Sequence, residues 1–120
     1  MFGLFLEVGP LRITKGDGDD DYVIGPAEQA WTDSYNIVFL DQPVNTGFSY
    51  GNTTLNSMQE GATEFMSFLT QFLNMYPELK QNDFHLTGES YAGKYLPLFA
   101  YYVLEYNKIT TNFKINFKST

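Results

Sequence analysis

The chain has 120 residues, of which 43% are hydrophobic and 18% aromatic, so it can bury the core of one domain and is too rich in aromatic residues for a disordered protein. Its formal net charge is −7, which argues against nucleic acid as a partner. The absence of cysteine excludes disulfides, thiolate metal ligands and a cysteine nucleophile. No apolar run approaches the roughly 18 residues of a membrane-spanning helix, and the first residues lack the basic region of a signal peptide.

An acidic, glycine-containing stretch, KGDGDDD at 15–21, is the first biased segment, and we expect it to form a solvated surface loop. Its aspartates have the alternating spacing of a calcium-binding loop. Tyr22, however, stands where such a loop requires glycine, and Pro26 lies inside it. We therefore expect no metal site in this segment, and we expect no cofactor in the chain.

The next element is a continuous apolar run, NIVFL at 36–40, which predicts a strand covered on both faces, as in a parallel sheet. Asp41 ends this predicted strand, and we interpret it as a carboxylate that fixes the following loop. The sequence Asn52-Thr53-Thr54 in that region is a glycosylation sequon. It would be used only if the chain enters the secretory route.

The clearest helix is predicted at about 57–76, because its apolar residues are spaced by three and four positions. Ser57 and Glu60 have the spacing of a capping box, and Pro77 disfavours helical geometry at the residue before it. The predicted apolar face consists of Met58, Ala62, Phe65, Leu69, Phe72 and Tyr76.

The last third of the chain alternates between strand and helix patterns. Residues 84–87 alternate into Gly88 and predict a strand. Pro97 is placed in the first turn of a helix that reaches about residue 107, where its missing N–H costs least. The alternating segment 113–117 predicts another strand. Strands and helices in this order indicate an α/β fold, and no repeat or linker divides residues 1–120, so we expect a single domain.

A glycine-rich turn, GESYAG, connects the strand at 84–87 to the following helix. A serine flanked by small residues at such a junction is typical of a nucleophile elbow, although ordinary turn chemistry can also produce it. Gly88 lies two residues before Ser90, whereas Gly93 lies three residues after it, so Ala92 must be the small residue on the helix side. The pattern predicts Ser90 as a nucleophile and the Tyr91 N–H as an oxyanion donor at the helix N-terminus.

Three segments resemble conserved blocks of the serine carboxypeptidase family: FHLTGESYAGKYLP at 84–97, NIVFLDQPVNTGFSY at 36–50 and LFLEVGP at 4–10. The resemblance covers nearly the whole chain. It implies an α/β-hydrolase fold, of which the chain would hold the part around the elbow. It also implies an acyl-enzyme at Ser90, release of the C-terminal residue of a peptide or protein substrate, and a lysosomal, vacuolar or secreted setting.

The resemblance also indicates what these residues lack. The family's Asn-Gly-Gly-Pro-Gly segment, which supplies the other oxyanion N–H, would lie just upstream of Met1, and the triad Asp and His would lie beyond Thr120. His85 precedes Ser90, and we interpret it as a strand histidine that is packed or hydrogen-bonded in the sheet. The chain alone is therefore expected to be inactive. Two alternatives stay open: a truncated homologue without activity, and a carboxypeptidase-like acyltransferase.

The resemblance further places Glu7 and Glu89 together, where family members bind the C-terminal carboxylate of the peptide. Two carboxylates at close range do not both ionise easily, so such a pair would keep a proton at about pH 5 and donate a hydrogen bond to the substrate. The alternative is that Glu89 is a helix N-terminal acid stabilised by the helix dipole and Glu7 a surface residue.

Overall fold

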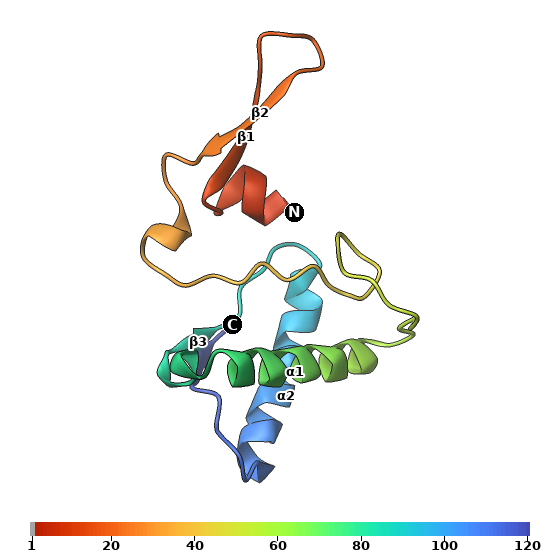
Figure 1. The fold of residues 1–120 in the computed structure, drawn as a ribbon. Coiled ribbons are helices and arrows are strands. Elements are labelled where there is room, and N and C mark those ends of the chain that lie inside the picture. The colour runs from red at the N-terminus through yellow and green to blue at the C-terminus, as the bar shows by residue number, and fades with distance from the viewer. Residues whose placement is uncertain (1) are drawn as a thin grey trace. The chain divides into compact units, whose positions relative to one another are not determined.

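The computed structural model describes residues 2–120 of the protein. They form two compact units, Met1–Thr54 and Leu55–Thr120, of which the second contains the predicted elbow. Figure 1 shows the course of the chain through a hairpin in the first unit and through two long helices in the second. Among the described residues, no helix is long and apolar enough to cross a membrane. The same residues contain no cluster of three His, Asp or Glu side chains that could hold a metal ion.

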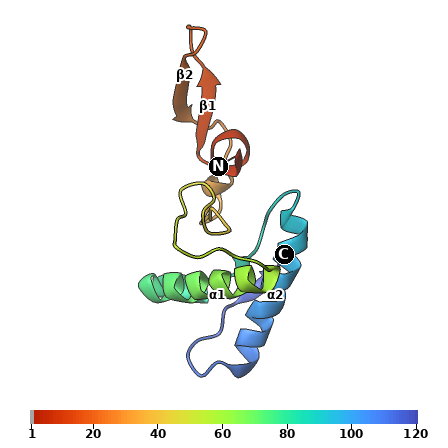
Figure 2. The same cartoon turned by 90° about the vertical axis from the view of Figure 1, so that its right-hand side faces the viewer.

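The first unit contains a β-hairpin that the sequence patterns did not predict. Strands β1 (Leu11–Lys15) and β2 (Tyr22–Pro26) pair antiparallel, with Ile13 opposite Ile24, and they lie side by side in Figure 2. The acidic stretch forms the exposed turn between them, in which the Gly16 N–H donates to the Asp21 carbonyl at 2.9 Å. The expectation of a solvated acidic loop is thus confirmed.

Two short helical turns flank this hairpin. The π-helical turn η1 (Gly3–Glu7) precedes β1 and contacts it. The 3-10 turn η2 (Trp31–Asp33) follows β2, and the Asp33 carboxylate accepts a hydrogen bond from the Ala30 N–H at 3.1 Å. The contact of η1 with β1 places Glu7, at the end of η1, beside the start of the hairpin.

The strand predicted at 36–40 is absent from the structure, and this prediction was wrong. A strand requires a neighbour that accepts and donates its main-chain hydrogen bonds. Within residues 2–120, the sheets are the pairs β1–β2 and β3–β4, and neither includes this segment. Val38 is 52% exposed and Phe39 36% exposed, so the apolar run that suggested a buried strand is uncovered here.

The first long helix of the second unit, α1 (Met58–Met75), confirms the helix predicted from the apolar spacing. Ser57 caps it, because its side chain accepts a hydrogen bond from the Glu60 N–H at 3.2 Å. The Glu60 carboxylate accepts in return from the N–H of Asn56, at 2.7 Å. Together these two hydrogen bonds satisfy two main-chain donors at the start of the helix.

The second long helix, α2 (Ala92–Ile109), begins five residues before Pro97. Pro97 therefore lies inside the helix, whereas it was predicted to lie in the first turn. Pro97 has no N–H to donate to the carbonyl four residues earlier, that of Gly93, so the helix tolerates one missing hydrogen bond in its second turn. The prediction of a helix was confirmed, and the prediction of where it begins was wrong.

Two short parallel strands, β3 (Phe84–His85) and β4 (Phe117–Ser119), complete the second unit. The strand predicted at 113–117 begins only at its last residue. The reason is that Asn107 of α2 binds the main chain of Ile115 at both polar groups, donating to its carbonyl at 2.7 Å and accepting from its N–H at 2.8 Å. Ile115 is thereby held against the helix instead of a strand.

The buried apolar side chains of the described residues all belong to the second unit. They come from both helices and from the segments that flank them, and they are Ala62, Phe65, Leu69, Leu73, Leu86, Ala92, Phe99, Ala100, Val103 and Ile115. At the centre, the rings of Phe65 and Phe99 stack with centroids 4.5 Å apart and planes 6° apart. This core fixes α2, and with it the turn that precedes α2.

Candidate active site

Ser90 occupies a strained turn between β3 and α2. Its φ is 57°, in the left-handed region that residues with a side chain rarely adopt. Such a conformation is costly and persists only where the surrounding structure holds it. The strand, the sharp turn and the helix expected of this motif are therefore all present around Ser90.

Two main-chain hydrogen bonds close the turn. The Ala92 N–H donates to the Glu89 carbonyl, and the Gly93 N–H donates to the Ser90 carbonyl, both at 3.0 Å. The side chains of Glu89 and Ser90 are exposed. The turn thus presents a hydroxyl and a carboxylate next to each other at the N-terminal end of α2.

Close packing within this turn explains which positions must be small. A Cβ atom on Gly88 would lie 2.5 Å from the Cβ of Ala92 and 3.2 Å from Leu96 Cδ1, and Ala92 itself is only 3% exposed. A Cβ on Gly93 would meet no atom within 4 Å. The close contact is therefore between Gly88 and Ala92, which agrees with the prediction that Ala92 is the small residue on the helix side. Gly93 is not sterically constrained.

The main-chain N–H of Tyr91 has no acceptor among residues 2–120. It belongs to the N-cap residue of α2, an 18-residue helix with no acidic residue in its first turn. The N-terminus of a helix carries a partial positive charge, which favours an anion at this position. A donor suited to an oxygen anion is therefore available beside Ser90.

A row of aromatic rings connects the turn to the core. Tyr91 contacts Tyr95 with ring centroids 6.0 Å apart, and Tyr95 stacks on Phe99 at 5.4 Å. Phe99 in turn stacks on Phe65 of α1. Because the Tyr91 ring is 60% exposed and Phe99 is buried, the row runs from the surface beside Ser90 into the interior.

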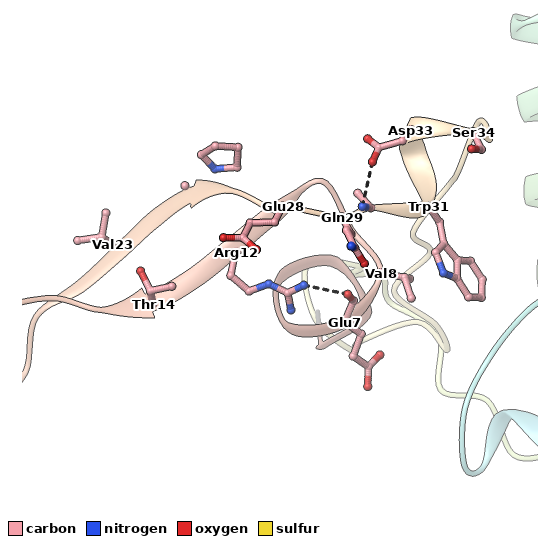
Figure 3. Close-up of a pocket in the computed structure, with 13 residues that line it drawn as sticks. Glu7, Val8, Arg12, Thr14, Val23, Glu28, Gln29, Trp31, Asp33 and Ser34 are labelled. Atoms are coloured by element: carbon pink, nitrogen blue, oxygen red, sulfur yellow. Dashed lines mark hydrogen bonds between the residues drawn. The ribbon is translucent and has the colours of Figure 1, made fainter.

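Glu7, in the first unit, also has an exposed side chain. Figure 3 shows the Arg12 guanidinium reaching the main-chain oxygen of Glu7, to which Nη2 donates at 3.1 Å. Glu7 lines an open cavity of about 830 Å³, together with Val8, Arg12, Thr14, Val23, Gly25, Pro26, Glu28, Gln29, Ala30, Trp31, Asp33 and Ser34. Arg12, which the sequence patterns did not single out, thus secures the main chain that carries Glu7.

Comparison with known proteins identifies the family. A family model described as "Serine carboxypeptidase" matches residues 1–120. The chain belongs to the serine carboxypeptidase family. It is 39% identical over 114 residues to carboxypeptidase Y homolog A of Ajellomyces capsulatus, covering 95% of this chain and 20% of that protein. It is 38% identical over 120 residues to a probable serine carboxypeptidase CPVL of Dictyostelium discoideum, covering 98% and 23%.

A solved structure supports the same relationship. The prohormone-processing carboxypeptidase Kex1 from Saccharomyces cerevisiae matches with a TM-score of 0.86 and 29% sequence identity, over 98% of this chain and 26% of that one. The expected α/β-hydrolase fold is thus confirmed, and the residues described here form the part of it around Ser90. The chain spans about a fifth of the length of the curated relatives that it matches.

The loop after residue 40 is organised by Asp41, as the sequence interpretation expected. One carboxylate oxygen of Asp41 accepts from the Phe48 N–H at 3.0 Å, and its carbonyl accepts from Ser49 Oγ at 2.6 Å. Gly47 has a φ of +54°, and a Cβ there would overlap the Asp41 carboxylate. Asp41 therefore has a structural role in shaping this loop.

His85 lies on β3, and its Nδ1 is 2.8 Å from the Ser119 hydroxyl on β4. This hydrogen bond links the two strands of the sheet, as the sequence interpretation of His85 anticipated. The histidine is thus engaged in strand pairing and precedes the turn that contains Ser90.

Proposed function

We propose that the protein is a serine-type carboxypeptidase in which Ser90 forms the acyl-enzyme. The observation that carries this proposal is the left-handed backbone of Ser90 between β3 and α2. A turn of this kind holds the serine hydroxyl clear of both flanking elements, where it can reach a substrate carbonyl. Membership of the serine carboxypeptidase family supplies the reaction class.

In the proposed reaction, Ser90 Oγ attacks the carbonyl carbon of the C-terminal peptide bond while its proton passes to a base. The tetrahedral intermediate collapses, the C–N bond breaks and the terminal amino acid leaves with that proton. Water then hydrolyses the ester on Ser90. The Tyr91 N–H, at the N-terminus of α2, would stabilise the oxyanion of both intermediates.

The base and its orienting carboxylate come from elsewhere in the full-length protein in this proposal. In α/β-hydrolases the aspartate and histidine follow the serine along the chain. His85 precedes Ser90 and is bonded to Ser119. We accordingly expect the 120-residue chain by itself to lack measurable peptidase activity.

We also propose that Glu7 and Glu89 bind the C-terminal carboxylate of the substrate. Glu89 precedes Ser90 directly, and both glutamate side chains are exposed in their respective units. A carboxylate pair can hold another carboxylate only by sharing a proton with it, which favours activity in an acidic compartment. A lysosomal, vacuolar or secreted setting is part of this proposal.

The test is hydrolysis of an N-blocked dipeptide by the full-length protein and two serine variants. Ser90→Ala is expected to lower kcat by about 10⁶. Ser67→Ala, which changes an exposed serine of α1, is the control and should leave kcat unchanged. Full activity in Ser90→Ala would refute the proposed nucleophile. Release of amino acid by the isolated 120-residue chain would refute the need for a distant base.

A further inference from the structure

The loop that precedes α1 carries a chemical signal that the proposed peptidase site does not use. Asn52-Thr53-Thr54 is the only Asn-x-Ser/Thr sequence among the nine asparagines of the chain, and its middle residue is not proline. This sequence is the acceptor signal for N-linked oligosaccharides. Residues 51–54 are all exposed in the structure.

The side-chain amide of Asn52 makes no hydrogen bond within the described residues, unlike the amides of several other asparagines. By contrast, the Asn107 amide is engaged at both ends by Ile115, and the Asn116 amide donates to Asp83 Oδ1 at 2.7 Å. A substituent on Asn52 therefore breaks no hydrogen bond of the fold.

A second asparagine holds the main chain on both sides of Asn52. Asn45 Nδ2 donates to the Thr53 carbonyl at 3.1 Å, and Asn45 Oδ1 accepts from the Gly51 N–H at 3.2 Å. The two bonds use only main-chain groups of the residues next to Asn52. The loop is thus shaped without the Asn52 side chain.

We propose that Asn52 is an N-glycosylation site of this protein. The modification joins Asn52 Nδ2 to the anomeric carbon of a lipid-linked oligosaccharide pyrophosphate. The bond between that carbon and the pyrophosphate oxygen breaks, the lipid pyrophosphate leaves with the electron pair, and the amide nitrogen loses one proton. The attached sugar would lie on the exposed loop, outside the buried core that fixes the turn at Ser90.

This proposal rests on the secretory setting proposed above but not on the chemistry of Ser90. The test expresses the full-length protein in a eukaryotic cell behind a cleavable secretion leader, so that it enters the glycosylating compartment. The purified protein is treated with a peptide amidase that releases N-glycans in oxygen-18 water and converts the modified asparagine to labelled aspartate. Mass spectrometry then examines the peptide that begins at Gly51, after cleavage behind the exposed Tyr50.

Labelled aspartate at position 52 is the expected result, and its absence from the secreted protein would overturn the proposal. Two neighbouring threonines offer a matched pair of variants. Thr54→Ala removes the acceptor signal and should abolish the label, whereas Thr53→Ala keeps the signal and should retain it. A label that persists in Thr54→Ala would equally contradict the proposed site. Ser90→Ala should be labelled like the unmodified sequence, which separates a failure of this proposal from a failure of the proposed peptidase activity.

Discussion

Gly88 and Ala92 pack against each other across the turn at Ser90, so closely that a Cβ on Gly88 would lie 2.5 Å from the Cβ of Ala92. The segment that leads from β3 into the turn and the first residue of α2 therefore meet at two small residues. This contact lets the chain reverse within the three intervening residues, Glu89, Ser90 and Tyr91. The left-handed backbone of Ser90 follows from that constraint.

Substitution of this glycine should accordingly damage both the fold and the site. Gly88→Ala is expected to cost about 1–3 kcal/mol of the free energy of unfolding through overpacking. Displacement of Ser90 by about 1 Å should lower kcat/KM by about 100-fold. Chemical denaturation and dipeptide hydrolysis by the full-length protein measure the two effects.

Gly93→Ala is the matched control, because a Cβ there meets no atom within 4 Å and the residue lies in the first turn of α2. It should leave activity unchanged and stabilise the protein by up to about 1 kcal/mol through its higher helix propensity. Equal losses of stability and activity in Gly88→Ala and Gly93→Ala would show that the contact between Gly88 and Ala92 does not constrain the turn.

Stability of the second unit should depend on the ring stack between α1 and α2. Phe99→Ala removes a ring that is 3% exposed and stacked on Phe65, so it should cost about 3–5 kcal/mol of the free energy of unfolding. Tyr101→Ala, on the same helix but 55% exposed, should change it by no more than about 0.5 kcal/mol. Urea denaturation, followed by circular dichroism, measures the free energy of unfolding of both variants. Similar losses for both would place the core elsewhere.

The proposed proton sharing between Glu7 and Glu89 predicts a specific pH dependence. In the full-length protein, KM for a peptide with a free carboxylate should rise between about pH 5 and pH 8, because the shared proton is lost. Glu89→Gln should flatten that rise, since an amide donates a hydrogen bond at every pH. For peptides with an amidated C-terminus, KM should depend little on pH, both in the unmodified protein and in Glu89→Gln.

Glu105→Gln is the control for this experiment. Glu105 lies near the other end of α2, where its hydrogen bond and its charge raise the pKa of Lys108. Removal of this carboxylate should leave the pH profile of KM as it is in the unmodified protein. A Glu89→Gln profile that matches the unmodified one would rule out the shared proton.

The two units should differ in their resistance to hydrogen exchange. The buried apolar side chains of the described residues all lie in the second unit, whereas Phe48 and Tyr50 of the first are 78% and 91% exposed. In the 120-residue chain, amides of β1 and β2 should therefore exchange faster than those of α1 and α2. Hydrogen-exchange mass spectrometry measures both. Equal protection of hairpin and helices would contradict this ranking of their stability.

Local signals in the sequence predicted the elements that depend mainly on neighbouring residues. The spacing of Phe65, Leu69 and the other apolar residues, with Ser57 as cap, placed α1 within about a residue of its observed ends. The turn at Ser90 was predicted from its small residues and from the resemblance of residues 84–97 to a family block, and Gly88 and Ala92 are in close contact in the structure.

Elements that depend on distant partners were harder to predict. The hairpin was not predicted because its strands, LRITK and YVIGP, are short and flank an acidic stretch typical of a loop. The available signal was the alternation of LRITK, followed by a glycine-containing turn and the β-branched residues Val23 and Ile24. The run 36–40 was read as a strand, but a strand exists only with a paired neighbour. The engagement of Ile115 by Asn107 involves a side chain of another element, which no local pattern indicates.

The start of α2 shows the limit of a rule based on one residue. Proline is best tolerated in the first helical turn, so Pro97 suggested a start near that residue. Tertiary packing prevails here, because Ala92 is buried against Gly88 and the helix begins at Ala92, directly after its N-cap residue Tyr91. The close contact between Gly88 and Ala92 thus decides where α2 begins, and not the preference of proline for the first turn of a helix.

Covalent trapping would show whether Ser90 is a nucleophile. The full-length protein is treated with a fluorophosphonate, whose phosphorus is attacked by an activated serine with loss of fluoride, and the modified residue is located by mass spectrometry. If Ser90 is the nucleophile, its modification should rise in parallel with the loss of peptidase activity, and Ser67 should remain unmodified. Activity that is lost while Ser90 remains unmodified, or Ser90 that stays unmodified in a fully active protein, would contradict this role of Ser90.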